Sequence, residues 1–141
     1  MKVAIYLSIV VAASAAVQRL SRATNEISVE SICGELGVMR FNANELPDHV
    51  SPNDVRMCAK HPSGRNRTLD LSEGACYFKA PYGCSRGWCW KACDEGGKWC
   101  WTAAESGYGP WRKCASYADC GTHDDTFGCG RWCGKQCGCS C

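Results

Sequence analysis

The most regular pattern of side chains lies between residues 83 and 102, where the tripeptide Trp-Cys-Trp occurs twice, at 88–90 and at 99–101. A polar stretch that ends in Gly96 and Gly97 separates the two copies. Glycine adopts positive φ without a steric penalty, so this pair indicates a turn. The pattern therefore predicts a β-hairpin whose loop lies at residues 94–97.

The length of that loop decides which side chains share a face, because successive side chains of a strand point to opposite faces. With an even-length loop, all four hairpin tryptophans lie on one face. Cys89, Cys93 and Cys100 then lie on the other face. An odd-length loop would separate the tryptophans. We expect the even-length arrangement, with one aromatic face and one face of disulfide anchors.

Cysteine spacing divides the rest of the chain into two halves. Residues 23–75 contain only Cys33 and Cys58, and residues 76–141 contain the other twelve of the 14 cysteines. Neither Cys33 nor Cys58 has another partner in its half, so we expect a disulfide between them, worth roughly 3 kcal/mol. The predicted fold class is small disulfide-rich α+β. It has a short helical N-terminal half, residues 23–75, and a Cys/Trp-rich β-hairpin C-terminal half, residues 76–141.

Two short helices are predicted in the N-terminal half. Ser28 can cap a helix that continues to about residue 36, where Gly37 ends it. Ser51 is a second N-cap, and Pro52 follows it at the first helical position. This second helix should end near Lys60, before a His-Pro pair. Each helix is too short to be stable alone, so the disulfide has to hold them together.

The C-terminal half predicts several short elements around the hairpin. Strands are expected at 68–71 and 75–78, and a turn at 81–83 leads into the hairpin. Residues 111–117 and 126–133 predict further strands, or a helical turn over 129–133. The spacing Cys-x-x-x-Cys at 89–93 and 129–133, with Cys-x-Cys in the tail, also matches the cysteine-stabilised αβ motif. That motif needs the first spacing on a helix and the second on a strand.

The first residues form a targeting segment. Lys2 precedes an apolar run at 3–13, and the small residues at 14–16 fit a signal-peptidase site. We expect a signal peptide at 1–16, because the run is too short to span a bilayer. Arg19 and Arg22 form an Arg-x-x-Arg site, which predicts a propeptide at 17–22 and a mature chain that begins at Ala23.

An even number of cysteines in a secreted, extracellular chain favours disulfides over free thiols. The alternative is a metal–thiolate cluster, suggested by Cys137-x-Cys139-x-Cys141. Thiolates persist as ligands mainly in reducing compartments, so we expect no metal and no cofactor. On the predicted loop at 63–67, Asn66 begins an Asn-Arg-Thr sequon and is a predicted glycosylation site.

The charge of the mature chain limits its partners. Of the 16 Lys and Arg, Lys2, Arg19 and Arg22 precede residue 23, and the remaining 13 stand against 14 Asp and Glu. A membrane-lytic peptide or a nucleic-acid binder needs a strongly positive field. We therefore expect no nucleic-acid partner and no stable membrane insertion, and we expect a monomer.

Four segments of the mature chain resemble a group of small secreted cysteine-rich proteins of filamentous ascomycete fungi. The segments are 33–39 (CGELGVM), 54–62 (DVRMCAKHP), 82–90 (YGCSRGWCW) and the terminal CGCSC. Such proteins are mostly candidate effectors that act at the interface with a host. The resemblance implies an extracellular role in host interaction and virulence, and it supplies no catalytic motif. Arthropod venom and salivary proteins share the Cys- and Trp-rich style.

The aromatic residues carry the main functional hypothesis, because exposed aromatic rings stack on sugars or bury into a partner protein. The structural alternative is that the tryptophans form the small core, since a domain of this size buries little surface. The candidate binding surface comprises the hairpin tryptophans and the aromatic residues that follow them: Trp88, Trp90, Trp99, Trp101, Tyr108, Trp111 and Trp132.

Catalysis has little support in the sequence, and we predict no catalytic residues and no enzyme. His49 and His61 could pair with a carboxylate for acid–base chemistry, as in small secreted ribonucleases, but no further motif accompanies them. The His123-Asp-Asp segment reads as a solvated acidic loop. The predicted function is recognition of a host or target protein or polysaccharide. The alternatives are a defensin-like toxin or antimicrobial protein, and a small secreted nuclease or hydrolase.

Overall fold

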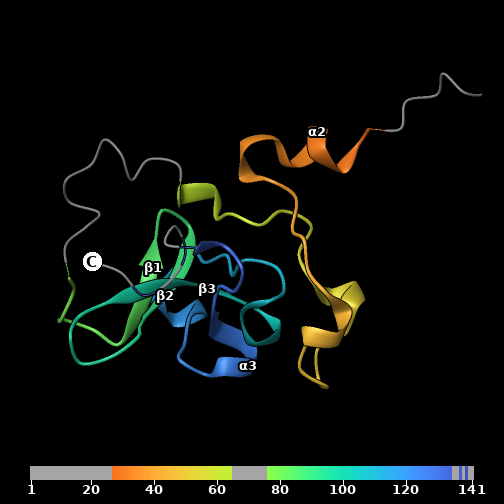
Figure 1. Cartoon of the computed structure of the whole chain (residues 1–141). Coiled ribbons are helices and arrows are strands. Elements are labelled where there is room, and N and C mark those ends of the chain that lie inside the picture. Colours follow the sequence, from red (N-terminus) through yellow and green to blue (C-terminus); the bar gives the residue numbers. More distant parts are fainter. Residues whose placement is uncertain (1–26, 65–75, 135–136, 138, 140–141) are drawn as a thin grey trace, which may run out of the picture.

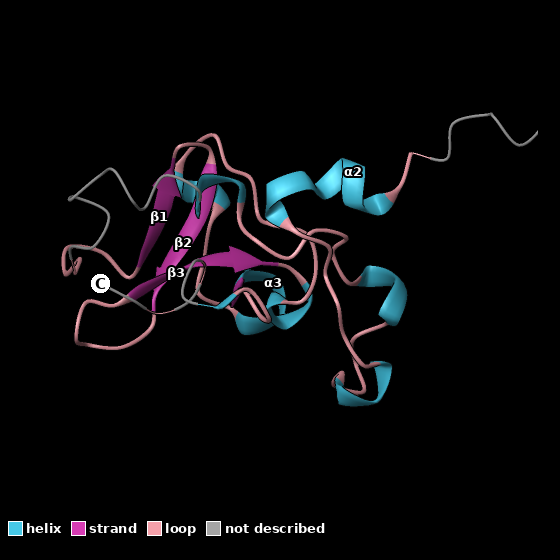
Figure 2. Ribbon diagram, turned by 45° about the horizontal axis from the view of Figure 1, so that its top comes forward, coloured by secondary structure: helices cyan, strands magenta, loops and turns pink. Residues whose placement is uncertain are grey.

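The computed structural model describes residues 27–64, 76–134, 137 and 139 (Figure 1). Its centre is a four-stranded antiparallel sheet in the order β1-β2-β3-β4. The strands are β1 (Tyr82–Ser85), β2 (Trp88–Ala92), β3 (Trp99–Ala103) and β4 (Gly128–Cys129). The α-helices are α2 (Val29–Cys33) and α3 (Asp124–Phe127), and 3-10 turns and loops make up most of the remainder (Figure 2). The chain is thus a small disulfide-rich α+β protein.

The predicted hairpin is formed by β2 and β3 with an even-length loop. Trp90 lies opposite Trp101, and Ala92 lies opposite Trp99. The amide of Gly96 donates to Oδ1 of Asp94 at 2.8 Å, and Gly97 has a φ of 75°. The loop therefore uses the glycine pair as the sequence predicts, and the four tryptophans share one face.

The predicted turn at 81–83 is wrong, because Tyr82 and Gly83 already belong to β1. The true turn between β1 and β2 consists of Arg86 and Gly87, both at positive φ. Gly83 lies opposite Trp90, and a Cβ atom there would approach Cζ2 of that indole to 2.7 Å. The glycine therefore makes room for a tryptophan ring, and it does not bend the chain.

The other predicted strands are only partly realised. Residues 76–78 form no strand, although the amide of Tyr77 donates to the carbonyl of Gly97 at 2.8 Å. In the 111–117 segment, Trp111 bridges to Ala103 and Lys113 bridges to Trp88, so this segment lies between β2 and β3 where they diverge. In the 126–133 segment only β4 is a strand, and no helical turn spans 129–133. The predicted strand at 68–71 lies outside the described residues.

Disulfides tie these short elements together, and the described residues contain no free cysteine. The predicted Cys33–Cys58 disulfide is present. The cysteine-stabilised αβ motif is not formed, because Cys89 lies in β2 and Cys93 directly follows that strand. The other pairs described in the C-terminal half are Cys84–Cys114, Cys89–Cys120, Cys93–Cys139, Cys100–Cys129 and Cys133–Cys137.

The N-terminal half contains the first predicted helix but not the second. Ser28 caps α2 by accepting a hydrogen bond from the amide of Ser31, and a 3-10 turn continues to Leu36. Ser51 also acts as an N-cap, but its 3-10 turn ends at Asp54. The following residues are extended because they pair with the chain after α2. The amide of Met39 donates to Met57, and that of Ala59 donates to Gly37, both at 2.8 Å.

Among the residues that the structure describes, no helix has the length and apolar character needed to cross a bilayer. The predicted signal peptide (1–16), the predicted propeptide (17–22) and the predicted glycosylation site at Asn66 all lie outside the described residues.

Candidate functional site

The four hairpin tryptophans form a continuous aromatic cluster, here called the inner face. Trp101 and Trp99 meet edge to face with ring centroids 5.1 Å apart, and Trp99 and Trp90 are 6.5 Å apart in the same arrangement. Trp101 is only 3% exposed, and Trp88, Trp90 and Trp99 are half-buried against the same core. Trp101 therefore belongs to the core, and its place on the candidate binding surface is corrected.

The imidazole of His61 covers the inner face. It stacks on Trp101 with centroids 4.4 Å apart and an interplanar angle of 2°. It meets Trp88 and Trp111 edge to face at 5.1 and 4.7 Å. His61 comes from the N-terminal half and is 1% exposed, so it completes a core that the hairpin cannot close alone.

The burial of His61 bears on the hydrolase alternative. The amide of Ser63 donates to Nδ1 of His61 at 3.1 Å, so the proton of a neutral ring is on Nε2. Enclosed by three indoles, this ring has no access to a macromolecular substrate. His49 is exposed, and its Nε2 lies 2.9 Å from Oγ of Ser106. His123 precedes α3 as its N-cap residue. The three histidines thus have unrelated surroundings.

A second aromatic cluster lies at the surface and is here called the outer stack. It consists of Phe41, Tyr108 and Trp132, from three separate loops. Phe41 and Trp132 are nearly parallel, with an interplanar angle of 9° and centroids 5.9 Å apart. Tyr108 meets Trp132 edge to face at 4.7 Å. Phe41 is 38% exposed and Trp132 is 37% exposed, so both rings present surface to solvent.

The backbone holds Trp132 in an unusual conformation. Its φ is 55°, in the left-handed region that side chains with a Cβ disfavour. Such a conformation costs about 1–3 kcal/mol and persists only where the surroundings impose it. The Cys133–Cys137 disulfide begins at the next residue, and Phe41 and Tyr108 contact the ring. The fold therefore fixes this exposed ring in one orientation.

The sequence identifies two members of the outer stack, Tyr108 and Trp132, but misses Phe41. Phe41 lies between Arg40 and Asn42 in a polar loop, where no periodic pattern marks it. An isolated large aromatic residue in such a loop is the only signal that could have pointed to it. Trp111, another predicted surface residue, is half-buried, and the guanidinium of Arg56 lies 4.2 Å from its ring centroid.

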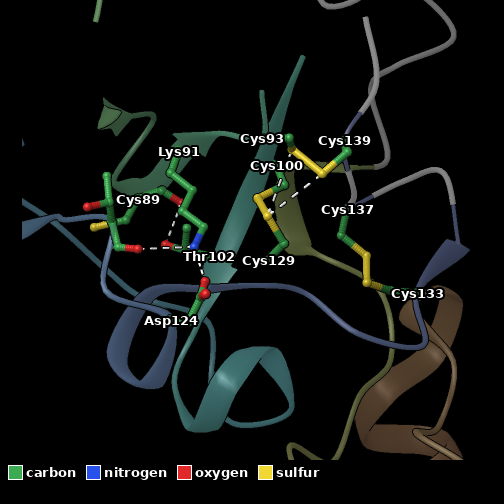
Figure 3. The surroundings of a disulfide bond; sticks show 11 residues. Cys89, Lys91, Cys93, Cys100, Thr102, Asp124, Cys129, Cys133, Cys137 and Cys139 are labelled. Atoms are coloured by element: carbon green, nitrogen blue, oxygen red, sulfur yellow. Dashed lines mark hydrogen bonds and ion pairs between the residues drawn. A yellow bond between two sulfur atoms is a disulfide. The ribbon is translucent and has the colours of Figure 1, made fainter. Parts of the chain in front are cut away.

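On the opposite face of the hairpin, a buried ammonium group meets an exposed carboxylate (Figure 3). Nζ of Lys91 donates to Oδ1 of Asp124 and, at 3.2 Å, to the carbonyl of Thr122. Lys91 is 8% exposed, and this pair fixes the start of α3 against β2. The hydrogen bond from Lys91 and its positive charge lower the pKa of Asp124. The predicted acidic loop therefore has a structural role at Asp124.

Replacing Asp124 with asparagine removes the ion pair with Lys91 and should lower the free energy of unfolding at pH 7. The loss should be only about 1 kcal/mol, because solvent screens the exposed carboxylate. A lowered pKa in the folded state means that the stabilisation is present above the unfolded value, near 4, and is lost as the pH falls through the folded value. The variant should therefore lose less stability than the wild type between pH 5 and pH 2, as measured by urea unfolding.

The matched control is Asp125→Asn, one residue further along α3 and exposed. It should leave the acid-induced loss of stability unchanged. Part of that loss should remain in both variants, because hydrogen bonds from the amides of Ser116 and Ala115 also lower the pKa of Asp119. An identical pH dependence for Asp124→Asn and Asp125→Asn would contradict the role assigned to Lys91 and Asp124.

Comparison of the chain with protein-family models, with curated proteins and with solved structures finds no match.

Proposed function

We propose that the protein is a secreted, disulfide-stabilised recognition protein that binds a host or target extracellular macromolecule through an aromatic surface. The observation that carries the proposal is the outer stack of Phe41, Tyr108 and Trp132. The extensive disulfide bonding is compatible with an extracellular protein. The resemblance to small cysteine-rich proteins of filamentous ascomycetes favours an effector role within this class.

The outer stack suits a binding role because its rings are already ordered before a partner binds. Aromatic anchors contribute most to affinity when they lose little conformational freedom on binding. Trp132 is already fixed by its neighbouring disulfide and by two ring contacts. The inner face is largely committed to the core, so the outer stack is the better surface for a sugar ring or for a pocket on a partner protein.

Replacing Trp132 with alanine should weaken binding of the target at least about tenfold, as expected for a central aromatic anchor. The first measurement is retention on insoluble chitin, cellulose and β-glucan, which tests the polysaccharide form of the proposal. Phe41→Ala should weaken the same interaction. Neither substitution removes a buried side chain, so both variants should keep the native disulfides and unfold in urea as cooperatively as the wild type.

The control is Tyr117→Ala, an aromatic residue that is 69% exposed and lies outside the outer stack. It should bind as the wild type does. Absence of retention on all three polysaccharides would restrict the proposal to protein targets. Equal binding by Trp132→Ala, Phe41→Ala and Tyr117→Ala would contradict the proposed site.

The two alternatives have weaker support. A defensin-like toxin is disfavoured because neither the 89–93 nor the 129–133 Cys-x-x-x-Cys spacing lies on a helix. A nuclease or hydrolase that uses His61 is disfavoured by the burial of that ring. We therefore propose a non-enzymatic monomer. The near-neutral charge of the mature chain argues against nucleic-acid binding and against electrostatic attachment to membranes.

A further inference from the structure

Two disulfides lie against one another at the end of the hairpin. They are Cys93–Cys139 and Cys100–Cys129 (Figure 3). The sulfur of Cys129 is 3.9 Å from that of Cys93 and also 3.9 Å from that of Cys139. All four sulfur atoms lie within 4.8 Å of one another. We call these four residues the tetracysteine cluster.

We propose that the tetracysteine cluster is a latent metal site, which binds one Zn²⁺ or a similar soft divalent cation after a dithiol has reduced the two disulfides. Four thiolates around Zn²⁺ form a tetrahedron with Zn–S bonds of about 2.3 Å, which places neighbouring sulfurs about 3.8 Å apart. The two distances from the sulfur of Cys129, to those of Cys93 and Cys139, already match that spacing, and no other pair of sulfurs is more than 4.8 Å apart. The two bonded pairs have to separate on reduction.

The short distances between the two disulfides also give a route for reduction of the buried Cys100–Cys129 bond. Cys139 is exposed, so the Cys93–Cys139 bond faces solvent, whereas Cys100 is fully buried. A dithiol reduces the exposed bond first, giving two thiols and a cyclic disulfide as the oxidised reductant. The thiolate of Cys139 or Cys93 then attacks the sulfur of Cys129 and releases the thiolate of Cys100. The bond so formed again involves a residue of the exposed pair.

A second dithiol reduces that new bond. Two dithiols have then supplied four electrons and four protons, and all four cysteines of the cluster are thiols. Binding of one Zn²⁺ releases those four protons and forms four zinc–sulfur bonds. Zinc would then join the same four segments that the disulfides join: the end of β2, β3, β4 and the tail. The sheet edge therefore keeps its crosslink in a reducing compartment, where disulfides do not persist.

The protein contains a comparison group for this proposal. The sulfurs of Cys89, Cys114 and Cys120 also lie within 4.8 Å of one another. This group has three cysteines, and two of them, Cys89 and Cys120, are fully or largely buried. Reduction of the two disulfides concerned, Cys84–Cys114 and Cys89–Cys120, would also free Cys84, but its sulfur is not among those that lie within 4.8 Å of one another. None of the three grouped cysteines is exposed as Cys139 is.

The test uses the full, oxidised protein and Co²⁺ as a spectroscopic probe. The protein is treated anaerobically with two equivalents of a dithiol and then titrated with Co²⁺. The expected result is a thiolate-to-cobalt charge-transfer band that saturates at one Co²⁺ per chain and is lost on addition of Zn²⁺. Alkylation of the zinc-loaded protein, followed by peptide mapping, should show protection of Cys93, Cys100, Cys129 and Cys139.

The double variant Cys93→Ser/Cys139→Ser should lose the charge-transfer band, because only two of the four ligands remain. The alkylation map of the wild type does not depend on how that variant folds. Absence of the band in the dithiol-treated wild type would overturn the proposal. So would protection of Cys89, Cys114 and Cys120 in place of the cluster, or an unchanged band in the variant. None of these outcomes depends on the aromatic surface.

Discussion

Replacing Arg56 with methionine is expected to lower the free energy of unfolding by about 2–3 kcal/mol, because it removes several hydrogen bonds that a charged group donates. Arg56 is 7% exposed and reaches from the N-terminal half into the C-terminal half. Nη1 donates to the carbonyl of Gly107 at 2.7 Å and to that of Tyr108 at 3.2 Å. Nη2 donates to the carbonyl of Arg131.

Methionine would remove all of these donations. The carbonyls of Gly107 and Tyr108 would each keep one backbone donor, the amides of Arg131 and Arg56, whereas the carbonyl of Arg131 would lose the guanidinium. Within residues 27–64 and 76–134 no carboxylate pairs with Arg56. Burial lowers the pKa of Arg56 to about 10, so the side chain still carries its charge at neutral pH. The ring of Trp111 lies 4.2 Å from the guanidinium carbon and provides a further favourable contact.

Two other variants separate charge from geometry. Arg56→Lys keeps the charge but loses the planar fork that serves several carbonyls, so it should recover less than half of the lost stability. Arg40→Met removes an exposed arginine of the same half and should change the stability by no more than about 0.5 kcal/mol. Urea unfolding of the oxidised proteins, followed by tryptophan fluorescence, measures all three. Equal stability of Arg56→Met and Arg40→Met would contradict this role.

The elements that local sequence determines could be predicted. The β2–β3 hairpin follows from two Trp-Cys-Trp copies and a glycine-ended loop, and its register follows from the even loop length. The cap at Ser28 and the Cys33–Cys58 disulfide also follow from neighbouring or isolated residues. The hairpin and the cap follow from steric rules that act over a few residues. The disulfide follows because each of its cysteines has one possible partner in the N-terminal half.

Contacts between distant segments could not be predicted. Arg56 and His61 look like polar residues of a helix and of its end, yet both are buried against the C-terminal half. Pairing of residues 55–60 with the chain after α2 outweighs a good N-cap at Ser51, because a short helix gains little by itself. The same tertiary contacts turn Trp101 from a predicted surface residue into a core residue.

Replacing Gly107 with alanine is expected to prevent formation of the native fold, with a cost above about 4 kcal/mol. Gly107 has a φ of 95°, and a Cβ atom there would lie 2.0 Å from the carbonyl oxygen of Cys129. That oxygen cannot retreat easily, because Cys129 pairs with Thr102 in the sheet and is bonded to Cys100. Movement of Gly107 would in turn withdraw the carbonyl that accepts from Arg56.

The matched control is Gly34→Ala, since Gly34 also has positive φ, at 50°, but a Cβ atom added there would have no neighbour within 4 Å. That variant should lose only the backbone preference, about 1–3 kcal/mol, since Gly34 combines its positive φ with a ψ of −127°. Oxidative refolding of both variants, followed by the yield of chains with the native disulfides and by urea unfolding, separates the two costs. A native yield for Gly107→Ala equal to that of Gly34→Ala would mean that the 104–109 loop can move away from β4. The binding surface would then lose its rigid support, because Tyr108 of the outer stack belongs to the same loop.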